Sequence, residues 1–244
     1  MPQLRCQSTL AVFSPAAVAF LTLMLVGTIA RAAPIEFGDF HLVNATQPLS
    51  FTNNGGTSGT LQALNVPVVF NFTVQSGLPT VDHAATLTIN PPGTLPTTLA
   101  AIVSGTLLDQ PIHPLNLSIT ENGTGKNLLT MISTGGDLVG FNLGVTGSVS
   151  GMNTSVYTSD FGTFNSPVSQ SYNLGLATLN VPLSVGPGGF LNSFAANVNG
   201  QFSVDSGGFT PKIPEPATAA LFGMGALAVA ALAASKRRRA GARA

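Results

Sequence analysis

The sequence is poor in the residue types that catalysis and cross-linking use most often. Only 7% of its 244 residues are charged, where about a quarter is ordinary for a soluble domain, and tryptophan is absent. The single cysteine, Cys6, lies in a segment that we expect to be removed during export. The working protein is then left without a disulfide, a thiol nucleophile or a thiolate metal site.

The formal net charge of zero hides an uneven distribution of charge along the chain. Seven of the nine basic residues lie near the two ends, so that residues 33–213 contain only Lys126 and Lys212. The same body contains eight acidic residues, which gives it a formal charge of −6: Glu36, Asp39, Asp82, Asp109, Glu121, Asp137, Asp160 and Asp205. A sparse acidic surface argues against nucleic acid as a partner, because phosphates require clusters of lysine and arginine.

Residues 1–32 have the organisation of a secretory signal peptide. Arg5 supplies a positive charge, residues 16–29 form an apolar stretch, and Ala30-Arg31-Ala32 provides the small-x-small cleavage pattern. As a helix, the apolar stretch would be about 21 Å long, which is too short for a permanent anchor in a bilayer core of about 30 Å. We expect signal peptidase to recognise Ala30 and Ala32 and to cut after Ala32.

Residues 214–244 contain three parts in a fixed order. Pro214-Glu215-Pro216 comes first, residues 217–234 follow without a charge, and a basic tail over residues 236–243 begins with Lys236, Arg237, Arg238 and Arg239. The prolines hold their segment extended and accessible, and an 18-residue helix of about 27 Å is just long enough to cross a bilayer. The basic residues fix the orientation by the positive-inside rule, with the tail in the cytoplasm and the body outside.

This order closely resembles the PEP-CTERM sorting signal of Gram-negative, biofilm-forming bacteria, and the resemblance is limited to residues 214–244. It implies that an exosortase, an integral-membrane cysteine protease, processes the chain at or near Pro214, Glu215 and Pro216. The body would then be released or re-anchored at the cell surface. A single-pass anchor without processing is the alternative. A GPI signal is disfavoured because its hydrophobic tail should not end in four consecutive cations.

Residues 33–213 are predicted to form one all-β domain. Apolar and polar residues alternate with period 2 over residues 66–74, 139–149 and 194–204, which is typical of half-buried strands. Shorter candidate strands are residues 85–89, 99–108, 115–120 and 127–133, with a hairpin loop over 121–126 and a bulge or break within 172–185. About ten short strands at this spacing favour an antiparallel β-sandwich of the jelly-roll or Ig-like kind.

Each histidine of the body has an aspartate nearby in the sequence. The pairs are Asp39/His41, Asp82/His83 and Asp109/His113, and their convergence would indicate a metal site or an acid–base site. The specific metal and nucleophile templates are missing, including His-Glu-x-x-His and Gly-x-Ser-x-Gly. We therefore expect exposed loop and edge residues rather than a cluster, and no catalytic, cofactor or metal site.

The leading hypothesis is a non-enzymatic protein of the cell surface or extracellular matrix, with exopolysaccharide as a candidate partner. The second is a β-sandwich module that binds a carbohydrate or another ligand. It is weakened because only Tyr157 and Tyr172 accompany 15 phenylalanines, most of which fall on predicted core faces. A secreted hydrolase ranks third, because only two glutamates remain in the body as candidates for paired carboxylates.

Overall fold

The computed structural model describes residues 34–152, 154–165 and 169–212, and this part of the chain is all-β. It contains fifteen strands and two short 3-10 turns, at Val74–Ser76 and Pro187–Gly189, and no α-helix. The strands are β1 (Pro34–Leu42), β2 (Leu49–Asn53), β3 (Gly59–Phe72), β4 (His83–Ile89), β5 (Ile102–Ser104), β6 (Leu107–Pro111), β7 (Leu115–Glu121), β8 (Asn127–Ser133), β9 (Asp137–Phe141), β10 (Gly147–Met152), β11 (Ser155–Thr158), β12 (Gly162–Phe164), β13 (Gln170–Ala177), β14 (Phe194–Asp205) and β15 (Phe209–Pro211).

Four of the sequence predictions lie outside the described residues: the signal peptide over 1–32, the processing residues 214–216, the membrane helix over 217–234 and the basic tail over 236–243. Within the described ranges, no helix has the length and the apolar character needed to cross a bilayer.

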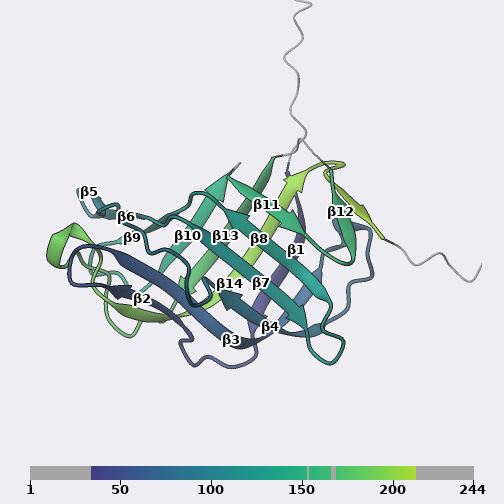
Figure 1. The fold of residues 1–244 in the computed structure, drawn as a ribbon, viewed down its shortest axis with the longest axis horizontal. Helices are drawn as coiled ribbons and strands as arrows, with labels where there is room; N and C mark the ends of the chain where they lie inside the picture. Colours follow the sequence, from purple (N-terminus) through teal and green to yellow (C-terminus); the bar gives the residue numbers. More distant parts are fainter. Residues whose placement is uncertain (1–33, 153, 166–168, 213–244) are drawn as a thin grey trace, which may run out of the picture. The chain divides into compact units, whose positions relative to one another are not determined.

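Thirteen strands form one antiparallel sheet in the order β11-β8-β7-β4-β3-β1-β14-β13-β10-β9-β6-β5, with β2 paired to both β14 and β3 (Figure 1). β1 and β2 both run antiparallel between the long strands β3 and β14, and together they behave as one strand interrupted by residues 43–48. Gln47 fixes this interruption, since its backbone N–H donates to Asn197 Oδ1 over 2.8 Å. The remaining strands, β12 and β15, pair with each other.

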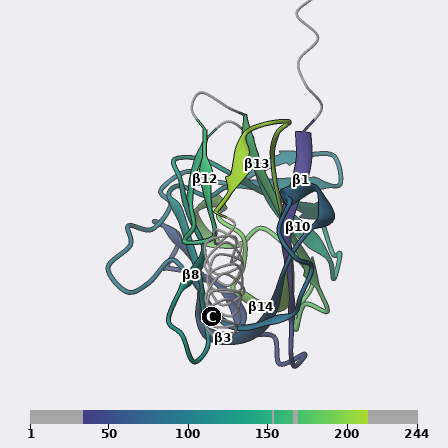
Figure 2. The ribbon, with the colours of Figure 1, turned by 90° about the vertical axis from the view of Figure 1, so that its right-hand side faces the viewer.

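The large sheet folds over so that its two halves face each other, with β8 on one side and β1 and β10 on the other in Figure 2. Tyr157 on the edge strand β11 joins the halves: its ring lies 5.4 Å from that of Phe37 on β1 and 6.1 Å from that of Phe202 on β14. Its hydroxyl donates to the carbonyl oxygen of Ser171 on β13 over 2.5 Å. An edge strand far away along the sheet is thereby brought against the central strands.

The core follows directly from the alternation of the sequence. Val68, Phe70 and Phe72 on β3 are at most 1% exposed, and Phe202 and Val204 on β14 are fully buried. Side chains at every second position of a strand point to the same face, so an alternating run buries one whole face. These strands contribute to a single continuous hydrophobic cluster whose members run from Phe37 to Phe209.

The sequence predicted several strands correctly and divided others wrongly. Residues 194–204, 115–120 and 127–133 lie in β14, β7 and β8, and β13 ends at Ala177, near the expected break. The alternating run 139–149 is two strands instead, because Leu143 adopts a positive φ of 65° and Gly144 N–H closes a turn onto the carbonyl of Phe141 over 2.8 Å. The run 99–108 is likewise a hairpin, since Gly105 has a φ of 62° between β5 and β6.

Candidate functional site

The three aspartate–histidine pairs do not converge on one site. Asp39 and His41 lie on β1 beside Asn71 of β3, whose amide donates to Asp82 Oδ1 over 2.8 Å. Burial raises the pKa of Asp39 above its ordinary value, against the opposing effects of Asn71 and His41. Asp39, His41 and Asp82 are not arranged as a group of three that could hold a metal ion, and no such group of His, Cys, Asp or Glu occurs among the described residues.

Asp109 and His113, the third pair, have different surroundings. His113 Nδ1 donates to the carbonyl oxygen of Thr134 over 2.7 Å. Asp109 Oδ1 is buried and has no hydrogen-bond partner among the described residues. Burial, followed by the charge of Asp137, raises the pKa of Asp109. The sequence spacing of Asp109 and His113 therefore does not produce an acid–base pair.

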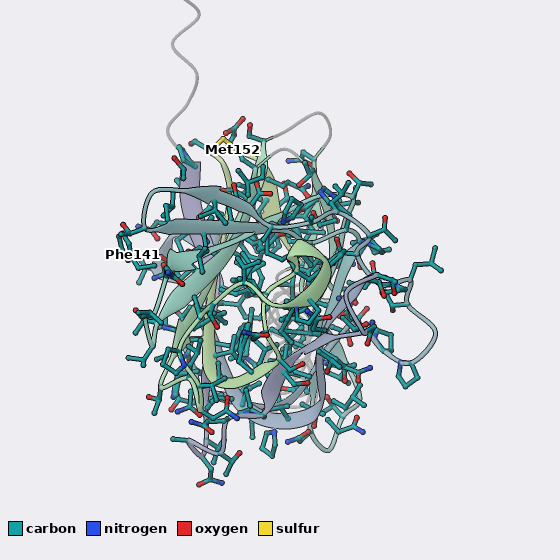
Figure 3. All side chains as sticks on the ribbon, turned by 90° about the vertical axis from the view of Figure 1, so that its left-hand side faces the viewer. Phe141 and Met152 are labelled. Carbon is teal, nitrogen blue, oxygen red and sulfur yellow. The ribbon has the colours of Figure 1, made fainter. Side chains whose placement is uncertain are left out.

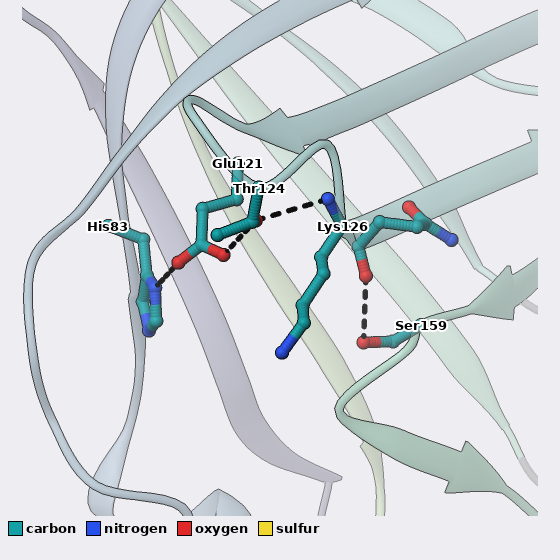
Figure 4. A network of polar contacts seen from close by, with 6 residues as sticks. His83, Glu121, Thr124, Lys126 and Ser159 are labelled. Atoms are coloured by element: carbon teal, nitrogen blue, oxygen red, sulfur yellow. Dashed lines mark hydrogen bonds and ion pairs between the residues drawn. The ribbon is translucent and has the colours of Figure 1, made fainter.

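His83 instead pairs with a residue that the sequence did not suggest. Its Nδ1 donates to Glu121 Oε1 over 2.7 Å (Figure 4). Glu121 lies opposite Ala85 in the β4–β7 ladder, and His83 is two positions from Ala85 on the same face. Diagonal neighbours on adjacent strands are close enough for long side chains to meet.

The Glu121 carboxylate is held from both sides. Thr124 in the β7–β8 hairpin loop donates its hydroxyl to Oε2, while His83 occupies Oε1. The hydrogen bonds from Thr124 and His83, in that order of size, hold the pKa of Glu121 below its ordinary value. Gly123 and Gly125 shape this loop with positive φ values of 83° and 69°, which glycine adopts without strain.

Aromatic rings surround the imidazole of His83. The ring of Phe72 meets it edge-on at 5.7 Å, and the ring of Phe161 does so at 5.5 Å. Lys126 Nζ lies 5.4 Å from the centroid of the same Phe161 ring, within the range of a cation–π interaction. The imidazole, two phenylalanines and a lysine thus form one wall.

That wall belongs to a pocket of about 380 Å³, within the size range of small-molecule sites. Its lining residues come from β3, the β3–β4 connection, β4, the β7–β8 hairpin, the β11–β12 loop and the end of the described chain: Phe72, Leu78, Pro79, Val81, His83, Lys126, Asp160, Phe161 and Lys212. The backbone N–H of Lys212 donates to the carbonyl oxygen of Phe161 over 2.7 Å, which holds Lys212 at the pocket. Both lysines of the acidic body line this one pocket.

Asp160 lines the pocket and Glu121 is bonded to His83 of its lining, and three of the four oxygens of these two carboxylates have hydrogen-bond partners. Asp160 Oδ2 accepts the backbone N–H of Asn127 over 2.8 Å, and both oxygens of Glu121 are hydrogen-bonded.

Two other concavities are each lined by one candidate residue from the sequence, Tyr172 or His113. One of about 410 Å³ runs along β10 and β13 beside Tyr172, and one of about 660 Å³ lies beside His113 and Pro114. Tyr172 and Tyr157 are each only 3% exposed, and burial raises the pKa of Tyr172 to about 12. Neither tyrosine offers the flat exposed face that a sugar ring would stack on.

Several exposed hydrophobic residues line these concavities: Val81 the pocket beside His83, Met152 the one beside Tyr172 and Leu95 the one beside His113. Phe141 and Met152 are 62% and 70% exposed and project outward from the body, as Figure 3 shows. Phe141 is the single phenylalanine among the large hydrophobic side chains that the described residues expose. It lies at the end of β9, next to Leu107 of β6.

Sequence reasoning missed the pocket, although two features pointed to it. The body contains only two lysines, and one of them, Lys126, is the last residue of the hairpin loop that the sequence placed at 121–126. What the sequence could not show is that Asp160, Phe161 and Lys212 return to this loop.

Comparison with known proteins identifies one segment of the chain. The PEP-CTERM protein-sorting motif matches residues 212–239, which include Pro214, Glu215, Pro216 and the basic residues 236–239. Neither a curated protein nor a solved structure matches the chain. The match confirms the resemblance drawn from the tail, and it marks an exported protein that is targeted to exosortase and whose precursor is anchored in the membrane.

Proposed function

We propose that this chain, whose tail carries the PEP-CTERM sorting motif, is a non-enzymatic protein of the bacterial cell surface or extracellular matrix. Exosortase processes it at or near Pro214, Glu215 and Pro216, and exopolysaccharide is its candidate matrix partner. The body is an antiparallel β-sandwich of the jelly-roll or Ig-like kind, and it functions outside the cell as a folded domain.

One observation supports this proposal above the others: the sorting motif begins where the β-body ends. The last strand, β15, ends at Pro211, and the matched residues begin at 212. Every member of the hydrophobic cluster lies between Phe37 and Phe209. A cut at residues 214–216 would therefore leave the entire described core on the exported side.

The remaining parts of the proposal concern routing. Signal peptidase removes residues 1–32 after recognising Ala30 and Ala32. Lys236, Arg237, Arg238 and Arg239 keep the tail in the cytoplasm while the membrane helix holds the precursor. The non-enzymatic role is supported by the hydrogen bonds that already occupy Nδ1 of His83, Nδ1 of His113 and both oxygens of Glu121.

Intact mass measurement of the exported protein tests this proposal. We expect a chain that begins at Ala33 and has lost residues 217–244, recovered from the cell surface or the medium. A surface form that retains Ala244 would overturn exosortase processing, and one that retains Met1 would overturn removal of the signal peptide.

A second candidate function is ligand binding, which the lysine-bearing pocket favours. A mostly apolar hollow with a few converging polar groups is the usual form of a small-molecule site. The two functions are compatible, because a surface protein can also hold a small ligand.

A further inference from the structure

We propose that the pocket beside His83 binds a small organic carboxylate with an apolar body. Its head lies at Lys126 and Lys212, and its body lies against the rings of Phe72 and Phe161. This inference names the ligand class for the ligand-binding function proposed above, and it does not depend on where the tail is processed.

The charge of the pocket argues for an anionic head. Lys126 and Lys212 are the only lysines in a body of charge −6, and both line this hollow. Neither lysine forms an ion pair with any described residue. An ammonium group that lacks a carboxylate partner is available to a charge-assisted hydrogen bond with a ligand.

The acids of the pocket do not compete strongly for these lysines. Glu121 is engaged by His83 and Thr124, and Asp160 accepts a backbone N–H. A cationic ligand would meet two lysines and no carboxylate with both oxygens open. The arrangement therefore selects against a positive head and for a negative one.

The walls of the pocket argue for an apolar body. Leu78 and Pro79 line one part of it and Phe72 and Phe161 another. Val81, which is 51% exposed, also lines it and would be covered by a bound ligand. Removing such surface from water is favourable in proportion to its area, so the body of the ligand contributes affinity while the head sets its direction.

The size of the hollow, about 380 Å³, suits a single short chain or a single ring. Octanoate has both required parts, and two related probes each lack one of them. The alcohol 1-octanol keeps the apolar body and lacks the charge, whereas acetate keeps the carboxylate and lacks the body.

The test is calorimetric titration of the exported protein, as cells accumulate it and without detergent, with octanoate, 1-octanol and acetate. We expect octanoate to bind at one site, about tenfold tighter than either control probe, because it alone gains both the charge-assisted contact and the apolar burial. Equal affinity for octanoate and 1-octanol, or no saturable binding of octanoate, would overturn the proposal.

Variants of the lysines locate the site. Lys126→Gln and Lys212→Gln should each weaken octanoate binding by about fivefold or more and leave 1-octanol unchanged, because each removes one partner of the carboxylate. Ser104→Asp is the matched control, since it gives the body the same formal charge as either lysine variant from an exposed position on β5. All three positions are exposed, so the fold should persist, and thermal unfolding checks that it does.

A second pair of variants tests the apolar wall. Val81→Ser should weaken binding of both octanoate and 1-octanol, whereas Val74→Ser, at an 80% exposed valine that does not line the pocket, should weaken neither. Octanoate affinity that is the same in both lysine variants as in Ser104→Asp would overturn the proposal. The mass of the C-terminus in the same preparation reports on sorting, so failure of binding and failure of processing are read separately.

Discussion

The sorting motif occupies one continuous stretch, residues 212–239, whereas the pocket is assembled from four separated stretches of the chain, within residues 72–83 and at 126, 160–161 and 212. The His83–Glu121 contact alone spans 38 positions, and Asp160 reaches Asn127 across 33. A protease that reads an extended segment needs only the local order of residues. A pocket forms only when the folded sheet brings its distant walls together. The motif therefore depends on local sequence, and the pocket depends on long-range contacts.

The largest effect that would break this comparison comes from the tail. Replacing Pro214-Glu215-Pro216 by Ala-Gln-Ala should abolish processing, so that the precursor retains residues 217–244, because both the rigid prolines and the carboxylate are gone. Thermal unfolding of the body should stay as in the unaltered protein, since the core ends at Phe209. The measurement is the mass of the chain in the membrane and surface fractions.

A matched control for this change is Thr218→Ser, two residues beyond the tripeptide. It should be processed like the unaltered chain. Normal processing of the Ala-Gln-Ala variant would show that Pro214, Glu215 and Pro216 are not the processing signal.

The next largest effect is on the stability of the β-body, and it should not change the processing of the tail. Phe37 is fully buried and contacts the rings of Tyr157, Phe164, Phe202 and Phe209. Phe37→Ala should lower the free energy of unfolding by about 3–5 kcal/mol, because it removes a buried ring and leaves a cavity. Urea unfolding of the exported protein measures this change.

Phe141 provides the matched control, because it is the same residue type and is 62% exposed. Phe141→Ala should change the free energy of unfolding by no more than about 0.5 kcal/mol. If the two variants were equally stable, the folded-over sheet with Phe37 in its core would be the wrong description of the body.

The smallest effect sharpens the account of the pocket wall. Glu121→Gln removes a carboxylate held by His83 and Thr124 and should lower the free energy of unfolding by up to about 1 kcal/mol near neutral pH, because solvent screens the charge of this accessible group. The folded-state pKa of Glu121 is lowered, so its contribution is complete above the ordinary value of 4.5 and is lost as the pH falls through the lower folded-state pKa. The difference between the two proteins should therefore disappear in acid.

Glu36 gives the opposite case for comparison. Burial, followed by the charge of Asp39, raises its pKa, so the folded protein favours the protonated form. Glu36→Gln should be neutral or stabilising near neutral pH, where the carboxylate is ionised. Urea unfolding at several pH values checks both variants, and a loss of stability in Glu36→Gln equal to that in Glu121→Gln would contradict the assignment.

The parts of the fold that the sequence predicted are those with local causes. The alternation over residues 194–204 buries one face of β14 whatever the rest of the chain does, and the glycines of the 121–126 loop close a hairpin. The division of residues 139–149 was missed because Leu143 takes a positive φ without being glycine. The apolar and polar residues on both sides of Leu143 keep alternating, so the sequence shows no sign of the turn.

The candidate site was harder to predict because its contacts are long-range. Nearness in sequence suggested Asp82 for His83, yet Glu121 from another strand is its partner. The pairing follows from the β4–β7 register, which a single sequence does not give. The two lysines were visible as the only ones in the body, but their shared pocket depends on how the chain returns after β15.

The most direct test of the central claim is a pulse–chase experiment in a host that has an exosortase, with an isogenic strain that lacks it. The account predicts that the labelled precursor loses residues 217–244 in the first strain and accumulates in the membrane, uncut, in the second. Identical conversion of the precursor in both strains, or no conversion in either, would contradict the account.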